Sequence, residues 1–80
     1  MGHDRTPEAI RAELTRLAIE QLGWAELPDG ELSERLDSMQ RLALVVAIED
    51  HFQIVFEPED DAAVRTLDDV IARVHAHLAV

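Results

Sequence analysis

Apolar residues recur at helical spacing in three segments of the chain, and each segment opens with residues that favour a helix start. In the first segment, Thr6 is a good N-cap and Pro7 suits the first helical position. The spacing of the apolar side chains then predicts a helix over about residues 7–22, and Gly23 is typical of a helix end. The predicted buried stripe consists of Ile10, Leu14, Leu17, Ala18 and Leu22.

The second segment predicts a helix from about Ser38 to Phe52, with Asp37 as N-cap and Gln40 completing a capping box. This helix carries more apolar residues than one buried face needs. One stripe holds Leu44, Val45, Ile48 and Phe52, and a second holds Met39, Leu42 and Val46 with Ala43 and Ala47 between. Either the second stripe is a partner-docking face, or the helix is buried nearly all round. Periodicity alone does not choose between these two interpretations.

The third segment begins at Thr66, which forms a predicted capping box with Asp69. Its buried stripe consists of Leu67, Val70, Ile71, Val74 and Leu78. Before it, residues 54–56 predict an extended connection, and Pro58 opens a short acidic helix that ends near Val64.

Residues 23–36 predict a long loop, with a turn at Pro28-Asp29-Gly30. Four apolar residues are expected to anchor this loop to the domain: Trp24, Leu27, Leu32 and Leu36. The predicted fold is therefore all-α. It is a single domain over residues 1–80, a small four-helix bundle with one short helix and a long loop between helices one and two.

The chain is strongly acidic, with 17 Asp and Glu against seven Arg and no Lys, and a net charge of −10. Phosphate groups repel such a surface, which argues against nucleic acid and anionic membranes and favours proteins with basic patches as partners. No apolar run is long enough for a membrane span, and Cys is absent. We expect a cytoplasmic monomer.

The sequence predicts neither a metal site nor an independent active site. His75 and His77 lie two residues apart, so on a helix they point to different faces, and we expect ordinary surface histidines. The acidic stretch 57–61 lacks the glycine and the ligand spacing of an EF-hand loop. No G-x-S-x-G motif and no glycine-rich phosphate loop is present.

Ser38 has a distinctive position, because it follows Asp37 and opens the most apolar helix. A phosphate on its hydroxyl would lie near the positive end of the helix dipole and near free backbone N–H groups. Serine is also common at helix starts for structural reasons alone, and the residues by themselves favour that simpler interpretation.

The segment Leu36-Asp37-Ser38-Met39, followed by Leu42, Leu44-Val45, Ile48-Glu49 and Phe52, resembles an acyl carrier protein. The resemblance covers most of the chain, because length, acidity and helix order agree with it. It implies that Ser38 receives a 4′-phosphopantetheine arm from coenzyme A through a phosphopantetheinyl transferase, beside the signature acid Asp37. The arm would carry acyl groups as thioesters on its thiol, and the protein itself would catalyse nothing.

The resemblance also implies further site residues. Met39, Leu42 and Val46, with Glu49 and Asp50, would dock acyl-loading, ketosynthase-type or acyltransferase enzymes of fatty-acid, polyketide or related lipid synthesis. The residues expected to line an interior acyl pocket are Leu44, Val45, Ile48, Phe52, Ile54 and Ile71. We expect a free-standing carrier.

Four residues depart from the pattern of fatty-acid carriers. Met39 replaces the usual leucine, and Gln40, Arg41 and Ala43 remove negative charge from the front of the second helix. These departures favour a specialised carrier over a general fatty-acid role. A peptidyl or aminoacyl carrier is an alternative, although an aspartate before the serine is less similar to that class. A second alternative is an acidic interaction module that binds partners through the Met39, Leu42 and Val46 face and has no prosthetic group.

Overall fold

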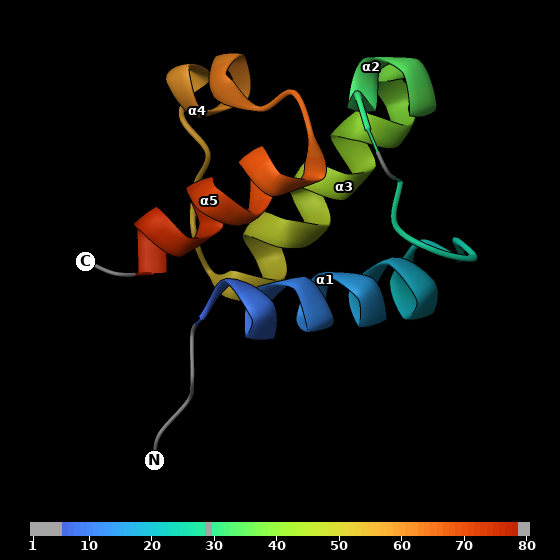
Figure 1. The fold of residues 1–80 in the computed structure, drawn as a ribbon, viewed down its shortest axis with the longest axis horizontal. Helices are drawn as coiled ribbons and strands as arrows, with labels where there is room; N and C mark the ends of the chain where they lie inside the picture. Colours follow the sequence, from blue (N-terminus) through green and yellow to red (C-terminus); the bar gives the residue numbers. More distant parts are fainter. Residues whose placement is uncertain (1–5, 29, 79–80) are drawn as a thin grey trace.

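The structure, a computed structural model, describes residues 6–28 and 30–78 (Figure 1). This part of the chain contains helices and no strand, only an isolated backbone bridge between Glu31 and Thr66. The all-α prediction is confirmed. The helices are α1 (Pro7–Gln21), α2 (Leu32–Arg35), α3 (Ser38–Phe52), α4 (Pro58–Ala63) and α5 (Leu67–Leu78).

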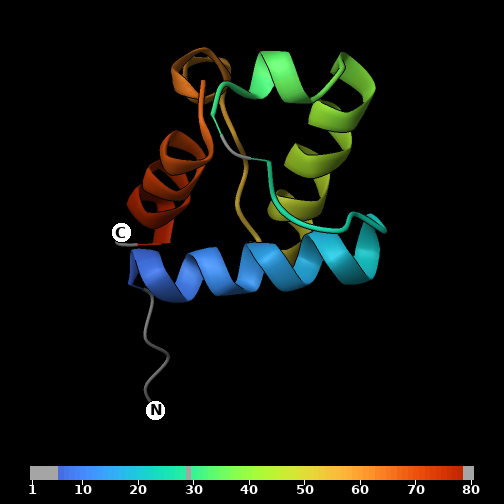
Figure 2. The ribbon, with the colours of Figure 1, turned by 45° about the vertical axis from the view of Figure 1, so that its right-hand side comes forward.

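The helices enclose a single core. Helix α1 lies along one side, and α3 and α5 rise from it towards α2 and α4 at the opposite end (Figure 2). The core is apolar and draws on every helix except α4, together with the connections on either side of α4. Its buried members are Ile10, Leu14, Leu17, Leu32, Leu44, Ala47, Ile48, Phe52, Phe56, Val64, Leu67, Val70, Ile71 and Val74.

The ends of α1 follow the predicted signals. The Thr6 hydroxyl accepts the Ala9 N–H at 3.2 Å, which satisfies one of the free donors of the first turn. At the other end Gly23 has a φ of 72°, a conformation that favours glycine, and it lets the Trp24 N–H reach the Ala18 carbonyl at 3.1 Å. The helix ends at Gln21, one residue before the predicted end.

The region predicted as one loop contains a helical turn, so the expectation of four helices was wrong by one. Helix α2 has four residues and is held by Leu32, which is buried and whose N–H donates to the Arg65 carbonyl at 2.8 Å. Leu36 closes the turn by donating its N–H to the Leu32 carbonyl at 2.7 Å. A single turn is too short for apolar periodicity to indicate it. The predicted anchors of the loop are confirmed, since Trp24, Leu27 and Leu36 pack against the core.

The turn predicted at residues 28–30 is described only in part, because Asp29 lies outside the described residues. Gly30 has a φ of 84°, which agrees with a turn that needs glycine.

Helix α5 begins with the predicted capping box. The Asp69 carboxylate accepts the N–H groups of Arg65 and Thr66, both at 3.1 Å, and the Thr66 hydroxyl accepts the Asp69 N–H at 3.3 Å. The two backbone donors, Arg65 first, lower the pKa of the Asp69 carboxyl below its ordinary value because they favour its charged form.

A buried carboxylate joins α4 to α5. Asp60 is 2% exposed, and its Oδ2 accepts the Glu57 N–H at 2.8 Å and contacts His77 Nε2 at 2.9 Å. Its Oδ1 accepts from Arg73 through Nε, at 2.8 Å, and through Nη2. The Glu57 N–H, then His77 and Arg73, hold the pKa of Asp60 far below its usual range, although burial opposes them.

His77 is therefore not the ordinary surface histidine that the sequence predicted. Besides its contact with Asp60, its ring stacks on Phe56 with centroids 5.8 Å apart. His75 is exposed, as predicted. The sequence could not indicate the role of His77, because its partners lie on other segments of the chain.

We expect the Asp60→Asn variant to be much less stable than the wild type at pH 7, because it leaves Arg73 without its carboxylate. Urea unfolding monitored by circular dichroism measures this. The exposed Glu59 on the same helix supplies the control, and Glu59→Gln should have a several-fold smaller effect.

The same carboxylate predicts a pH dependence. Because the pKa of Asp60 is lower in the folded than in the unfolded chain, its contribution to stability is fully present above the ordinary pKa of 3.8. It is lost as the pH falls from there towards the folded pKa. The stability of Asp60→Asn should not show this loss as the pH falls. Identical acid-unfolding profiles for the variant and the wild type would contradict the stabilising role of the Asp60 carboxylate.

Candidate functional site

The start of α3 is fixed by two reciprocal hydrogen bonds. The Asp37 Oδ1 accepts the Gln40 N–H at 2.8 Å, and the Gln40 Oε1 accepts the Asp37 N–H at 3.0 Å. The Arg41 N–H donates to the Asp37 carbonyl at 2.9 Å, which is the first bond of the helix. The predicted capping box is confirmed, and it defines the backbone around Ser38.

Ser38 occupies the first position of α3 and its side chain is exposed. The N–H groups of the first helical turn have no carbonyl within the helix to bind. Asp37 satisfies the one on Gln40, and those on Ser38 and Met39 have no acceptor among residues 6–28 and 30–78, at the positive end of the helix dipole. An anion bound to the Ser38 hydroxyl would therefore lie in a favourable field.

The second apolar stripe of α3 faces the surface. Met39, Leu42 and Val46 are 76%, 61% and 53% exposed, so the interpretation that α3 is buried all round was wrong. This exposed apolar face borders a hollow of about 560 Å³ between α3 and the end of α1. The other residues of the hollow are Gln21, Leu22, Ala43, Ala47 and Asp50. The apolar surface thus begins at the residue after Ser38.

A second, smaller hollow lies on the other side of Leu42, between α3 and α4. It measures about 300 Å³ and is lined by Ser38, Arg41, Leu42, Val45 and Asp61. We call it the α3–α4 groove. Arg41 crosses it, since its Nη2 donates to the carbonyls of Asp61 at 3.1 Å and Val64 at 2.8 Å. Ser38 therefore lies between the α3–α4 groove and an exposed apolar face.

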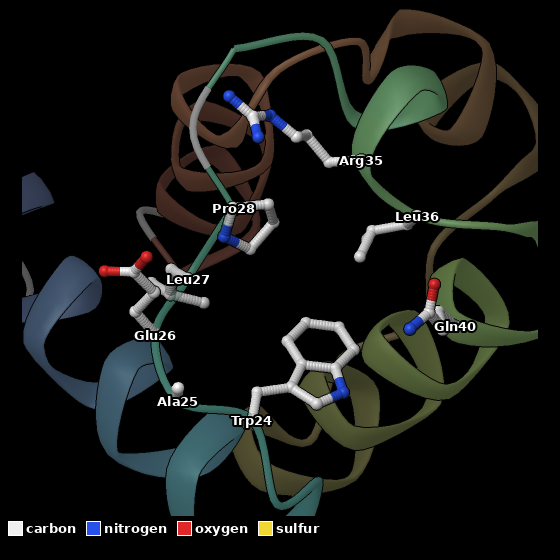
Figure 3. A pocket seen from close by; sticks show the side chains of 8 residues that line it. All are labelled: Trp24, Ala25, Glu26, Leu27, Pro28, Arg35, Leu36 and Gln40. Atoms are coloured by element: carbon white, nitrogen blue, oxygen red, sulfur yellow. The ribbon is translucent and has the colours of Figure 1, made fainter.

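A third hollow, of about 470 Å³, separates the loop after α1 from α2 and the start of α3 (Figure 3). The Trp24 ring points into it below Leu36, and Gln40 lines its α3 side. Ser38 is not among its lining residues. This hollow shares Gln40 with the capping box, so the packing of the loop and the start of α3 are linked.

The residues expected to line an acyl pocket divide into two groups. Leu44, Ile48, Phe52 and Ile71 are buried in the core. Val45 and Ile54 are partly buried and pack against it. An acyl pocket among these six residues remains a prediction.

The two acidic residues expected to dock partners also differ. Asp50 is exposed and lies in the hollow beside Val46. Glu49 is half-buried, and its Oε2 accepts the Phe56 N–H at 2.7 Å. Glu49 thus orders the connection between α3 and α4. The sequence did not indicate this internal role, because the donor lies seven residues away in an irregular segment.

Residues 12–74 match the family described as "Phosphopantetheine attachment site". The chain belongs to this family. It is therefore a carrier protein that holds covalently attached 4′-phosphopantetheine, as the resemblance implied. Comparison with curated proteins gives no significant match, and comparison with solved structures gives none either.

The described residues of this carrier protein fit such a group. Attachment needs a hydroxyl that a transferase can reach, and Ser38 offers one at an exposed helix start within the matched range. Within residues 6–28 and 30–78, no helix is long and apolar enough to cross a membrane. The same residues contain no group of three or more His, Cys, Asp or Glu side chains that could hold a metal ion.

The capping box predicts how the site responds to mutation. We expect Asp37→Ala to lower the free energy of unfolding by about 0.5–2 kcal/mol, because the Gln40 N–H loses its acceptor. Asp37→Asn should cost much less, since the amide oxygen accepts the same N–H. Unfolding followed by the fluorescence of Trp24, the single tryptophan, measures both. Equal effects of the two substitutions would show that the cap does not hold the helix start.

Proposed function

We propose that this carrier protein is an acyl carrier with its 4′-phosphopantetheine arm on Ser38. The observation that carries the proposal is the exposed position of Ser38 at the capped start of α3, next to an exposed apolar face. When bound, the arm supplies a thiol that holds acyl groups as thioesters. The protein's own residues position the arm and present it to partner enzymes, and we propose that the chain itself catalyses nothing.

Ser38 is favoured over Ser33, the only other serine in the chain. Ser33 is exposed too, but it lies in a helix of four residues whose N-cap has no side-chain hydrogen bond. Ser38 instead opens a helix of 15 residues with a complete capping box. The longer helix has the stronger dipole field for an attached phosphate.

The neighbourhood of Ser38 supports an acyl rather than a peptidyl cargo. Asp37 precedes the serine, and no glycine occurs between Leu36 and Phe52, whereas peptidyl carriers tend to have glycine-rich surroundings there. The front of α3 carries Gln40, Arg41 and Ala43 where fatty-acid carriers show acids and uncharged residues. This reduced negative charge supports a specialised polyketide or related lipid pathway.

The exposed apolar face formed by Met39, Leu42 and Val46 is the proposed docking surface for a phosphopantetheinyl transferase and for acyl-loading, ketosynthase-type or acyltransferase enzymes. Contiguous apolar surface of this kind marks protein interaction sites. Asp50, exposed in the hollow beside this face, would pair with a basic residue of the partner.

Incubation with coenzyme A and a promiscuous phosphopantetheinyl transferase tests the attachment site. Intact-protein mass spectrometry should show one phosphopantetheine added to the wild type and to Ser33→Ala, and none added to Ser38→Ala. Circular dichroism of Ser38→Ala should show an unchanged fold, because the side chain is exposed.

If phosphopantetheine were added to Ser38→Ala but not to Ser33→Ala, the attachment site would be Ser33 on α2. No addition to the folded wild type, repeated with transferases from the source organism, would contradict a carrier role on Ser38. It would instead favour an interaction module without a prosthetic group. Assays of the loaded protein with acyl-transferring and with amino-acid-activating enzymes distinguish an acyl from a peptidyl carrier.

A charge placed on the docking face should disrupt partner recognition. We expect Val46→Asp to lower kcat/KM of an acyl-transferring partner at least about tenfold, the equivalent of about 1.4 kcal/mol of lost transition-state stabilisation. Ile19 is 48% exposed on α1 and is not among the residues that line the hollows beside Val46, so Ile19→Asp is the control and should leave kcat/KM within about twofold. Equal losses for both variants would contradict the assigned face.

A further inference from the structure

Arg41 carries a positive charge that no carboxylate of the described chain neutralises. Other arginines form ion pairs, for example Arg11 with Asp68, Arg65 with Glu31, and Arg73 with Asp60. The hydrogen bonds of the Arg41 side chain within residues 6–28 and 30–78 go to main-chain carbonyls instead. This cation lies in the groove that Ser38 lines, in a chain of net charge −10.

The carbonyls of α4 use only part of the guanidinium. Nη2 donates to Asp61 O and Val64 O, and this fixes the side chain across the α3–α4 groove. A guanidinium has five N–H donors, so the Nε–H and the two donors on Nη1 remain without a partner in the described chain. Arg41 follows Ser38 by three residues on α3, and residues at this spacing are neighbours on a helix surface.

Two carboxylates near Ser38 oppose the favourable field that the start of α3 offers an anion. Asp37 precedes Ser38, and Asp61 lines the same groove. A phosphodiester on the Ser38 hydroxyl would add a further negative charge to this acidic surface. Arg41 is the cationic residue of the groove, and its forked N–H groups match the geometry of phosphate oxygens better than a lysine would.

We propose that Arg41 is a positioning residue whose free N–H groups bind the phosphate of the phosphopantetheine arm, while its Nη2 remains bonded to the carbonyls of α4. This proposal rests on the proposed function, because it requires the arm on Ser38. The phosphate contact would couple the arm to the position of α4. One guanidinium thereby connects the attachment site to the groove between the two helices.

NMR of the loaded protein tests the contact directly. In the wild type, loading should shift the Arg41 Nε–H resonance downfield, and the phosphodiester ³¹P signal should differ from that of the Arg41→Gln variant. The control Arg16→Gln removes the same charge from an exposed position on α1, and it should leave the ³¹P signal as in the wild type. Relative to Arg41→Gln, Arg41→Lys should recover only part of the wild-type ³¹P shift, because an ammonium cannot bind a phosphate through the planar pair of N–H donors that a guanidinium offers.

Thermal unfolding separates this contact from the structural role of Arg41 in holding α4. Each protein is measured with and without the arm, so that any loss of the α4 contact cancels in the difference. We expect loading to raise the Tm of the wild type and of Arg16→Gln by roughly 2–5 °C. In Arg41→Gln this increment should vanish.

The outcomes distinguish the two proposals. Loading of Ser38 in the wild type without a shift of the Arg41 Nε–H, and with equal Tm increments in wild type and Arg41→Gln, would overturn the role of Arg41 and leave the carrier proposal standing. Failure of Ser38 to accept the arm at all, seen in the mass spectrum before any NMR, would overturn both. A ³¹P change in Arg16→Gln as large as in Arg41→Gln would show a general charge effect and would also overturn the role of Arg41.

Discussion

The architecture depends on one constraint, which is that α3 must pack into the core with one face while it leaves another apolar face exposed. Leu44, Ile48 and Phe52 fix its orientation, because each is buried among residues of the other helices. Once that face is fixed, the rotation of the helix places Ser38 and Met39 at the surface. The capping box then holds the helix start. A change of α3 rotation would therefore move the attachment residue and the apolar face together.

Polar contacts, rather than apolar packing, hold the short helix α4. No residue of α4 belongs to the buried apolar core, and its one buried side chain is the Asp60 carboxylate. Asp60 binds α5 through Arg73 and His77, and Arg41 binds the far end of α4 from α3. A helix of six residues is too short to be stable alone, so these contacts hold it in place together with the buried Phe56 and Val64 on either side of it. The Arg41 contacts also cross the groove beside Ser38.

The sequence predicted the elements that depend on local signals. The caps at Thr6, Asp37 and Thr66 lie beside the stripes that they precede, and all three are confirmed. The contacts that the sequence could not predict join distant segments. The burial of Asp60 depends on α5, and the turn at α2 depends on the Arg65 carbonyl. The exposure of the second stripe of α3 could not be read from periodicity, because it depends on which face the other helices cover.

The most direct test of the central claim is to locate the arm on protein isolated from its own cells. Trypsin cleaves after arginine, so it separates the two serines of this chain: residues 36–41 contain Ser38 and residues 17–35 contain Ser33. Tandem mass spectrometry of the digest should find phosphopantetheine, with or without an acyl group, on peptide 36–41. An unmodified peptide 36–41, in a digest whose peptide 17–35 carries the group, would contradict the assignment of the arm to Ser38.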